Sequence, residues 1–118
     1  MGVGWVTAPP DAPLPGYVCL IAKRHVAEPF DLDDLEGHSF WDALMHVARG
    51  VRAATQSVKI NYEIHGNTVP HLHTHVFPRF RGDPFEGRPI APTEIGFHRS
   101  ASELGVLRAA IHAEGPAR

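Results

Sequence analysis

The chain has 118 residues, a formal net charge of −2 and a single cysteine, Cys19. This length predicts one compact domain over residues 1–118, because two ordinary domains would need a longer chain. The near balance of charges disfavours a nucleic-acid surface or a polybasic membrane patch. The lone cysteine excludes an intramolecular disulfide and favours a reducing compartment. Since no apolar run approaches the roughly 20 residues of a membrane span and no signal-peptide layout is present, we expect a soluble, cytoplasmic protein.

The N-terminal third of the chain predicts two strands separated by a loop. Residues 4–7 are compatible with a short edge strand. Residues 8–16 contain four prolines, which remove backbone donors that a sheet needs, so we expect a loop there. Residues 17–22 are apolar and partly aromatic or β-branched, as in a strand that is buried on both faces.

A long helix is predicted from about residue 33 to residue 56, where apolar residues recur at helical spacing. Asp33 and Glu36 resemble a capping box at its start. The residues expected to face the core are Trp41, Leu44 and Val51. The histidines expected to lie at the surface or at element boundaries, without a joint task, are His38, His46, His98 and His112.

The second half predicts a hairpin and a shorter helix. Residues 58–64 form the first expected strand, turn residues follow at 65–67, and residues 70–78 form the second strand. Residues 79–92 lack periodicity and contain Gly-Asp-Pro and Gly-Arg-Pro steps, which indicates an irregular surface loop. A capping box at Ser100 to Glu103 and an apolar face beyond it predict a helix at about 101–113.

The second hairpin strand carries three histidines at alternate positions. In a strand, His71, His73 and His75 share one face, whereas Leu72 and Thr74 point to the other. Three interpretations are open: a solvated polar face, a metal site borne by the strand, or nucleophilic catalysis at phosphorus. No Cys-x-x-Cys and no His-Glu-x-x-His supports the metal site. A neutral imidazole needs only to be oriented to attack phosphorus, and neighbouring histidines can donate to phosphate oxygens.

Residues Gly66 to Arg79, which read GNTVPHLHTHVFPR, resemble the signature of the histidine-triad (HIT) nucleotide hydrolases and transferases. A looser match covers most of residues 15–83. The resemblance implies an α+β fold, in which a HIT-like antiparallel sheet packs against one long helix and a short C-terminal helix follows. It also implies a homodimer, a purine nucleotide substrate and no required cofactor, although a polyphosphate substrate could carry a divalent ion.

The resemblance also assigns roles to the three histidines. His73 would attack the α-phosphorus and form a nucleotidyl-histidine that water then hydrolyses. The main-chain carbonyl of His71 would hold the other ring nitrogen of His73, and His75 would contact the phosphate and the leaving group. The third histidine is present rather than glutamine, which places the chain with the hydrolase-like branches. Dinucleoside polyphosphates, nucleoside phosphoramidates and adenylylated adducts stay open as substrates, and a nucleotide-binding module without turnover is an alternative.

Three further residues match or replace substrate-binding positions of the family. Thr68 corresponds to a hydroxyl that bonds phosphate, and Asn61 lies close to the upstream amide residue. Tyr17 stands where well-known members have a histidine that supports the triad, and tyrosine is a poor proton carrier near neutral pH. His25 lies at the other end of that strand and is expected to be a structural turn residue. Arg79 and its neighbour Arg81 are expected to be solvated loop charges, with contact to distal phosphates as the alternative.

Overall fold

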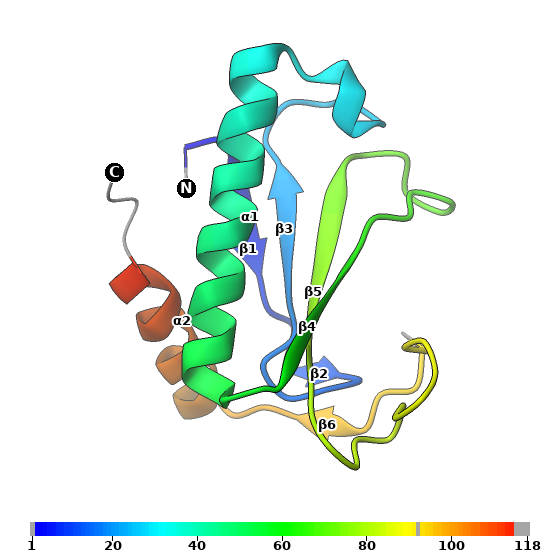
Figure 1. The fold of residues 1–118 in the computed structure, drawn as a ribbon, viewed down its shortest axis with the longest axis vertical. Helices are drawn as coiled ribbons and strands as arrows, with labels where there is room; N and C mark the ends of the chain where they lie inside the picture. The colour runs from blue at the N-terminus through cyan, green and yellow to red at the C-terminus, as the bar shows by residue number, and fades with distance from the viewer. Residues whose placement is uncertain (1, 92, 115–118) are drawn as a thin grey trace.

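The computed structural model describes residues 2–91 and 93–114, and its centre is a four-stranded antiparallel sheet. The strands are β1 (Gly4–Thr7), β3 (Val18–Ala22), β4 (Lys59–Glu63) and β5 (His73–Arg79), in the order β1-β3-β5-β4. The helix α1 (Asp34–Thr55) crosses one face of this sheet, and α2 (Ala101–Glu114) packs beside α1 (Figure 1). The expected α+β architecture with one long and one shorter helix is confirmed.

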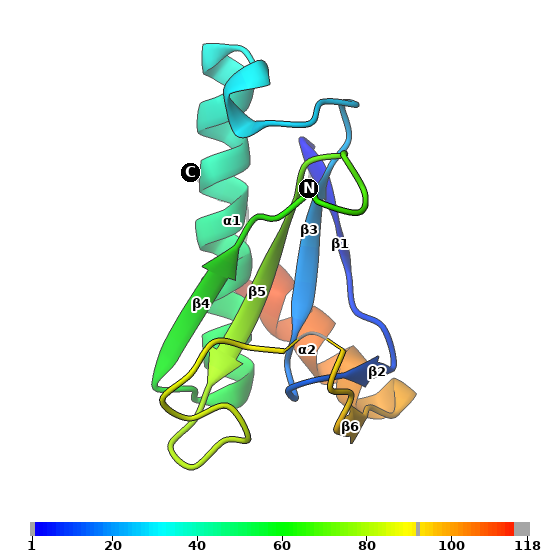
Figure 2. The same ribbon diagram turned by 90° about the vertical axis from the view of Figure 1, so that its right-hand side faces the viewer.

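The two faces of the sheet have different neighbours because side chains alternate along each strand. Even-numbered residues of β3 and β5 point to the helical side of the sheet and are buried; these are Val18, Leu20, Ala22, Thr74, Val76 and Pro78. Odd-numbered residues, His73 and His75 among them, point to the face that the helices leave uncovered, which Figure 2 shows from the front. The sheet therefore holds the histidines on a rigid layer whose reverse side is core.

The helix α1 begins where the sequence predicts, but two of its side chains differ from expectation. Asp33 and Glu36 form the reciprocal capping box. Trp41, expected in the core, is 61% exposed, because the buried stripe runs through Phe40 and Leu44, and a neighbouring helical position points about 100° away. His46, expected at the surface, is buried and its Nε2 donates to the carbonyl oxygen of Ile111 at 2.9 Å. The cause is α2, which covers this side of α1.

The proline-rich segments are irregular, as expected, but they are packed rather than free. Residues 8–16 include the two-residue strand β2 (Asp11–Ala12), which pairs with β6 (Phe97–His98). A turn of 3-10 helix, η1 (Pro29–Asp31), precedes α1. The loop at residues 79–92 was expected to be a surface excursion, whereas it buries Phe85 and Ile90 in a second core cluster with Leu14, Tyr17, Cys19 and Phe77. Because Cys19 and Phe77 lie on the same face as the histidines, that cluster covers one end of the histidine face.

Candidate functional site

The strand register arranges the uncovered face in rows that run across the sheet. One row consists of Trp5, Ile21 and His73, from β1, β3 and β5. The next row consists of Thr7, Cys19, His75 and Glu63, from all four strands. Paired residues of antiparallel strands project on the same side with their Cβ atoms about 4.5–5.5 Å apart. Each histidine therefore has defined neighbours toward β1 and toward β4.

His73 is held in one orientation by its own chain. Its Nδ1 lies 2.7 Å from the main-chain carbonyl oxygen of His71. Because a carbonyl can only accept, Nδ1 carries the proton, and Nε2 of the neutral ring carries the lone pair. This bond fixes the tautomer that a nucleophilic imidazole needs.

His71 precedes β5, which begins only at His73, so the strand is shorter than the three-histidine pattern predicts. The ring of His71 is anchored instead by contacts to the end of the neighbouring strand β3 and to the turn after it. Its Nε2 donates to the carbonyl oxygen of Ala22 at 2.7 Å, and its Nδ1 lies 2.8 Å from Nδ1 of His25. When the His71 ring carries only the proton on Nε2, its Nδ1 accepts this hydrogen bond and the Nδ1 of His25 donates it. His25, expected to be a structural turn residue, thus belongs to the histidine network.

His75 is held by Tyr17. The Tyr17 hydroxyl lies 2.7 Å from Nδ1 of His75, and the two rings are stacked. Burial, followed by the neighbouring Cys19, raises the pKa of Tyr17 above its ordinary value, so the phenol keeps its proton. Burial, followed by the charges of His73 and His65, lowers the pKa of His75 and favours its neutral form. When the phenol donates to Nδ1, the neutral His75 ring carries its proton on Nε2.

Cys19 lies between these groups and is not a competing nucleophile. It is the pairing partner of His75 on β3 and is buried. Burial raises the pKa of the Cys19 thiol to about 11. Because the thiolate is the nucleophilic form of cysteine, this side chain is inert at neutral pH.

A second imidazole beside His75 was not singled out from the sequence. The Nε2 of His65 donates to Oε1 of Glu63 at 2.9 Å, and the centroid of the His65 ring lies 5.8 Å from that of His75. His65 was interpreted only as a turn residue. In the sequence, the only hint of this role for His65 is that it follows Glu63 by two residues. The structure adds that Glu63 is the cross-strand partner of His75.

The structure places the other candidate residues around this centre. Asn61 lies on the histidine face opposite Phe77, and its Oδ1 accepts from Arg79 at 2.9 Å. Thr68 is exposed in the connection between β4 and β5. Arg79 is not a solvated charge, because its guanidinium bonds Asp83 through two nitrogens. Arg81 is exposed, as expected for a loop charge.

The described residues offer no ready metal centre. Within residues 2–91 and 93–114, no three side chains of histidine, cysteine, aspartate or glutamate are arranged so that they could hold a metal ion. None of the described helices is long and apolar enough to cross a membrane.

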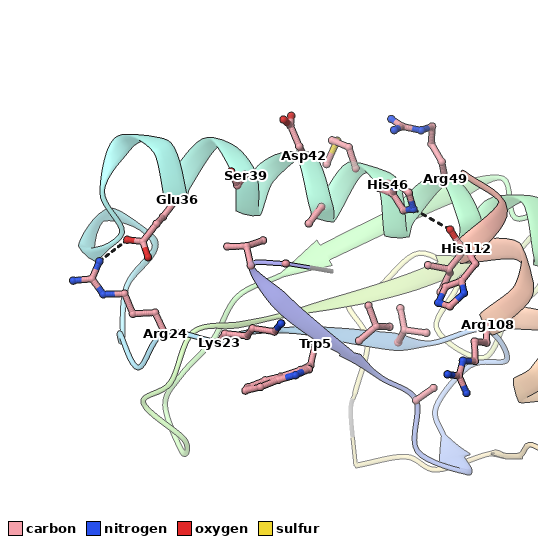
Figure 3. Close-up of a pocket in the computed structure, with 18 of the residues that line it drawn as sticks. Trp5, Lys23, Arg24, Glu36, Ser39, Asp42, His46, Arg49, Arg108 and His112 are labelled. Atoms are coloured by element: carbon pink, nitrogen blue, oxygen red, sulfur yellow. Dashed lines mark hydrogen bonds and ion pairs between the residues drawn. The ribbon is translucent and has the colours of Figure 1, made fainter. Parts of the chain in front are cut away.

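A broad groove lies elsewhere on the molecule, between β1, α1 and α2 (Figure 3). Its labelled side chains come chiefly from the helices; Asp42 and His46 project from α1, and Arg108 and His112 from α2. Most of the groove lies on the helical side of the sheet, opposite the histidines, but Trp5 of β1 also lines it. The groove therefore reaches the β1 edge of the sheet, next to the histidine face.

Comparison with known proteins agrees with this geometry. A model of the HIT domain family matches residues 8–82. The chain belongs to the HIT domain family. The matched range contains Tyr17, His25 and all three histidines of the motif.

Individual relatives of this HIT-domain chain are moderately similar in sequence and closely similar in fold. Protein Hit of Bacillus subtilis is 28% identical over 76 residues, which are 59% of this chain and 52% of that protein, so the match spans about half of the relative. A histidine triad protein from Bradyrhizobium japonicum superposes with a TM-score of 0.85 at 26% identity, over 97% of this chain and 85% of that one. A histidine triad (HIT) protein from Sinorhizobium meliloti gives 0.83 at 27% identity, over 97% and 84%.

One structural neighbour of lower identity was solved with zinc. This HIT-family protein from Mycobacterium smegmatis is 20% identical, has a TM-score of 0.69, and is covered over 84% of its length by the whole of this chain. At this identity the likeness concerns the fold alone.

Proposed function

We propose that this HIT-domain protein hydrolyses purine nucleotide conjugates at the α-phosphate through a covalent nucleotidyl-histidine on His73. The observation that carries the proposal is the 2.7 Å bond from Nδ1 of His73 to the carbonyl oxygen of His71, which leaves the Nε2 lone pair for attack. The neighbouring His75, with its proton directed to Nε2 by Tyr17, supplies a donor beside that nucleophile.

The two steps balance with these residues and water. In the first step Nε2 of His73 forms a bond to phosphorus while the bond to the leaving group breaks, and the leaving atom takes a proton from water while the Nε2–H of His75 donates a hydrogen bond to the departing group. In the second step a water molecule returns a proton to solvent as its oxygen bonds to phosphorus and displaces His73. His73 regains its lone pair, and the neutral His75 ring keeps its proton throughout.

The nucleoside base is proposed to lie toward β1. Trp5 is in the same row of the sheet as His73, on the same face, and is 54% exposed. Ile21 lies between them and is partly exposed. An exposed indole beside an aliphatic side chain offers a surface on which a purine can stack.

A rapid-quench experiment tests the proposal directly. Adenosine and guanosine phosphoramidates and dinucleoside polyphosphates are mixed with the protein, quenched within one turnover and analysed by mass spectrometry under alkaline conditions that preserve a P–N bond. The expected result is a nucleotidyl adduct on His73. Quenching of Trp5 fluorescence by AMP in a Trp41→Phe background, without an adduct or turnover, would instead identify a binding module. Stoichiometric metal with loss of activity on chelation would support the metal site.

Tyr17→Phe is expected to lower kcat about tenfold while leaving the fold intact, because it removes one hydrogen bond to His75 and no buried apolar surface. Without the phenol, Nδ1 of His75 loses the partner that keeps the ring proton on Nε2. Steady-state kinetics measure the effect, and Tyr62→Phe is the matched control because Tyr62 is on β4 and points away from the histidines. A Tyr17→Phe variant with an unchanged kcat contradicts this role.

We further propose that the protein is a homodimer joined through β4. This strand is at one end of the sheet order, so its outer edge has no partner among the described strands. Val58 and Tyr62 beside this edge are exposed although they are apolar or aromatic. An exposed edge with apolar side chains favours pairing with another strand. Light scattering measures this, and a mass of one chain, 12.9 kDa, contradicts it.

A further inference from the structure

The two flanks of His75 and His73 differ in chemistry. Toward β1 the face carries Trp5 and Ile21. Toward β4 it carries a carboxylate, because Glu63 is the cross-strand partner of His75. Since the base is proposed to lie toward β1, the leaving group departs toward β4 and meets Glu63.

The charge of Glu63 is poorly screened and acts on His75. The Glu63 side chain is only 21% exposed. The groups that face His75 are Tyr17 and Cys19 from β3, His73 from its own strand, and Glu63 with His65 from the β4 side. Among them Glu63 alone brings a negative charge, and its field raises the pKa of His75 against the lowering by burial, His73 and His65.

Among the described ion pairs, none joins Glu63 to a lysine or arginine of β4 or β5. Arg79 is on the same face and feels the charge of Glu63, but its guanidinium is engaged by Asp83 and Asn61. The ammonium of Lys59 bonds the carbonyl oxygen of Ile60. The ion-pair partner that the described residues give Glu63 is His65. The Glu63–His65 pair therefore carries one negative charge when His65 is neutral and none when it is protonated, so it never presents net positive charge.

A polyphosphate leaving group and an amine leaving group respond to this pair in opposite ways. A polyphosphate brings several negative charges toward a carboxylate, and like charges at close range weaken binding. In a phosphoramidate the P–N bond breaks with its electron pair staying on nitrogen, which takes a proton from water while the Nε2–H of His75 donates a hydrogen bond to the departing group. The released alkylamine then takes a second proton from water and becomes an ammonium ion. A nearby carboxylate stabilises the positive charge that develops on nitrogen.

We propose that Glu63, which also holds His65, is a specificity-determining residue that makes the site prefer amine leaving groups to polyphosphate leaving groups. This inference rests on the proposed function. It goes further because it names the residue that selects among substrates which share the same phosphorus chemistry.

The test compares kcat/KM for an adenosine 5′-phosphoramidate of a primary alkylamine with that for diadenosine tetraphosphate. Wild type should prefer the phosphoramidate, and Glu63→Gln should shift the ratio at least about tenfold toward the polyphosphate. Glutamine still accepts from Nε2 of His65, so the geometry is kept while the charge is lost. The control Asp42→Asn makes the same change of net charge on α1, on the opposite side of the sheet, and should leave the ratio unchanged.

A binding measurement keeps the inference testable without turnover. In a His73→Gly background, Glu63→Gln should tighten diadenosine tetraphosphate about tenfold and leave AMP binding nearly unchanged. An unchanged ratio and unchanged binding would overturn the inference while the His73 adduct still supported the proposed function. Weaker polyphosphate turnover in Glu63→Gln only when Mg²⁺ is present would also overturn it, because Glu63 would then serve a metal-polyphosphate complex. Absence of any adduct, with the binding shift present, would defeat the proposed function alone.

Discussion

Replacement of His73 by glycine is expected to lower kcat for every nucleotide conjugate by about 10³-fold or more, because the variant loses the atom that bonds to phosphorus. The backbone of β5 should persist, since His73 is on the uncovered face and its side chain contributes no apolar core. Steady-state kinetics measure the loss, and circular dichroism with AMP binding reports that the fold and the nucleotide site remain. His38→Ala, an exposed histidine on α1, is the matched control and should retain full activity.

Addition of free imidazole to the His73→Gly variant tests the assignment of His73 as nucleophile more directly. In His73→Gly the missing ring leaves a space beside the carbonyl oxygen of His71, and added imidazole can attack phosphorus from there to give a nucleotidyl-imidazole that water hydrolyses. Partial recovery of turnover that saturates with imidazole would support nucleophilic attack by His73. Full activity of His73→Gly without imidazole would remove the nucleophile assignment, and loss of AMP binding with loss of activity would indicate a structural defect.

The features that the sequence predicted correctly depend on short-range patterns. The alternation of His73 and His75 with Thr74 and Val76 places histidines on one face, and β5 confirms it. The capping box at Asp33 and the apolar spacing beyond it predicted α1, because both signals lie within a few turns. A pattern of this kind needs no knowledge of what the element packs against.

The contacts that complete the site could not be predicted, because they join residues far apart in the chain. Tyr17 and His75 are separated by 58 positions, and His25 and His71 by 46. Periodicity carries no information on such pairs until strand register is known. The burial of His46 has the same origin, since it depends on where α2 packs. The prediction for Trp41 is wrong in the opposite sense, because this large apolar residue lies next to the buried stripe of α1 and is exposed.

The structure gives a contact to Tyr17, whose role the sequence leaves open. In the sequence, Tyr17 stands where well-known HIT proteins have a histidine that supports the triad. The structure gives it a definite contact, a hydrogen bond of 2.7 Å to Nδ1 of His75. Because its pKa is raised, the phenol orients His75 but does not accept or release a proton near neutral pH. Tyr17 therefore acts on His75 as a fixed hydrogen-bond donor.

Arg79→Ala is expected to lower the free energy of unfolding by about 3–5 kcal/mol, because it removes the partner of a buried carboxylate. Arg79 joins β5 to the loop at 79–92 by bonding both carboxylate oxygens of Asp83 and the carbonyl oxygen of Phe85. The Asp83 side chain is 2% exposed, so the variant leaves a buried carboxylate without its partner. Urea unfolding at pH 7 measures the loss. Arg88→Ala, which breaks an exposed pair with Glu94, is the control and should cost less than about 1 kcal/mol.

The same ion pair predicts how stability depends on pH. Hydrogen bonds from Arg79 lower the pKa of Asp83 from 3.8 to about 2. A carboxyl whose pKa is lower in the folded state stabilises the fold fully above its unfolded pKa, and this stabilisation of about 2 kcal/mol is lost as the pH falls through the folded pKa. The stability difference between wild type and Asp83→Asn should therefore be constant from pH 7 to about pH 5 and shrink between about pH 4 and pH 2. A difference that stays constant to pH 2 would mean that Asp83 does not titrate as an ion-paired carboxylate, and that the loop is held by its buried Phe85 instead.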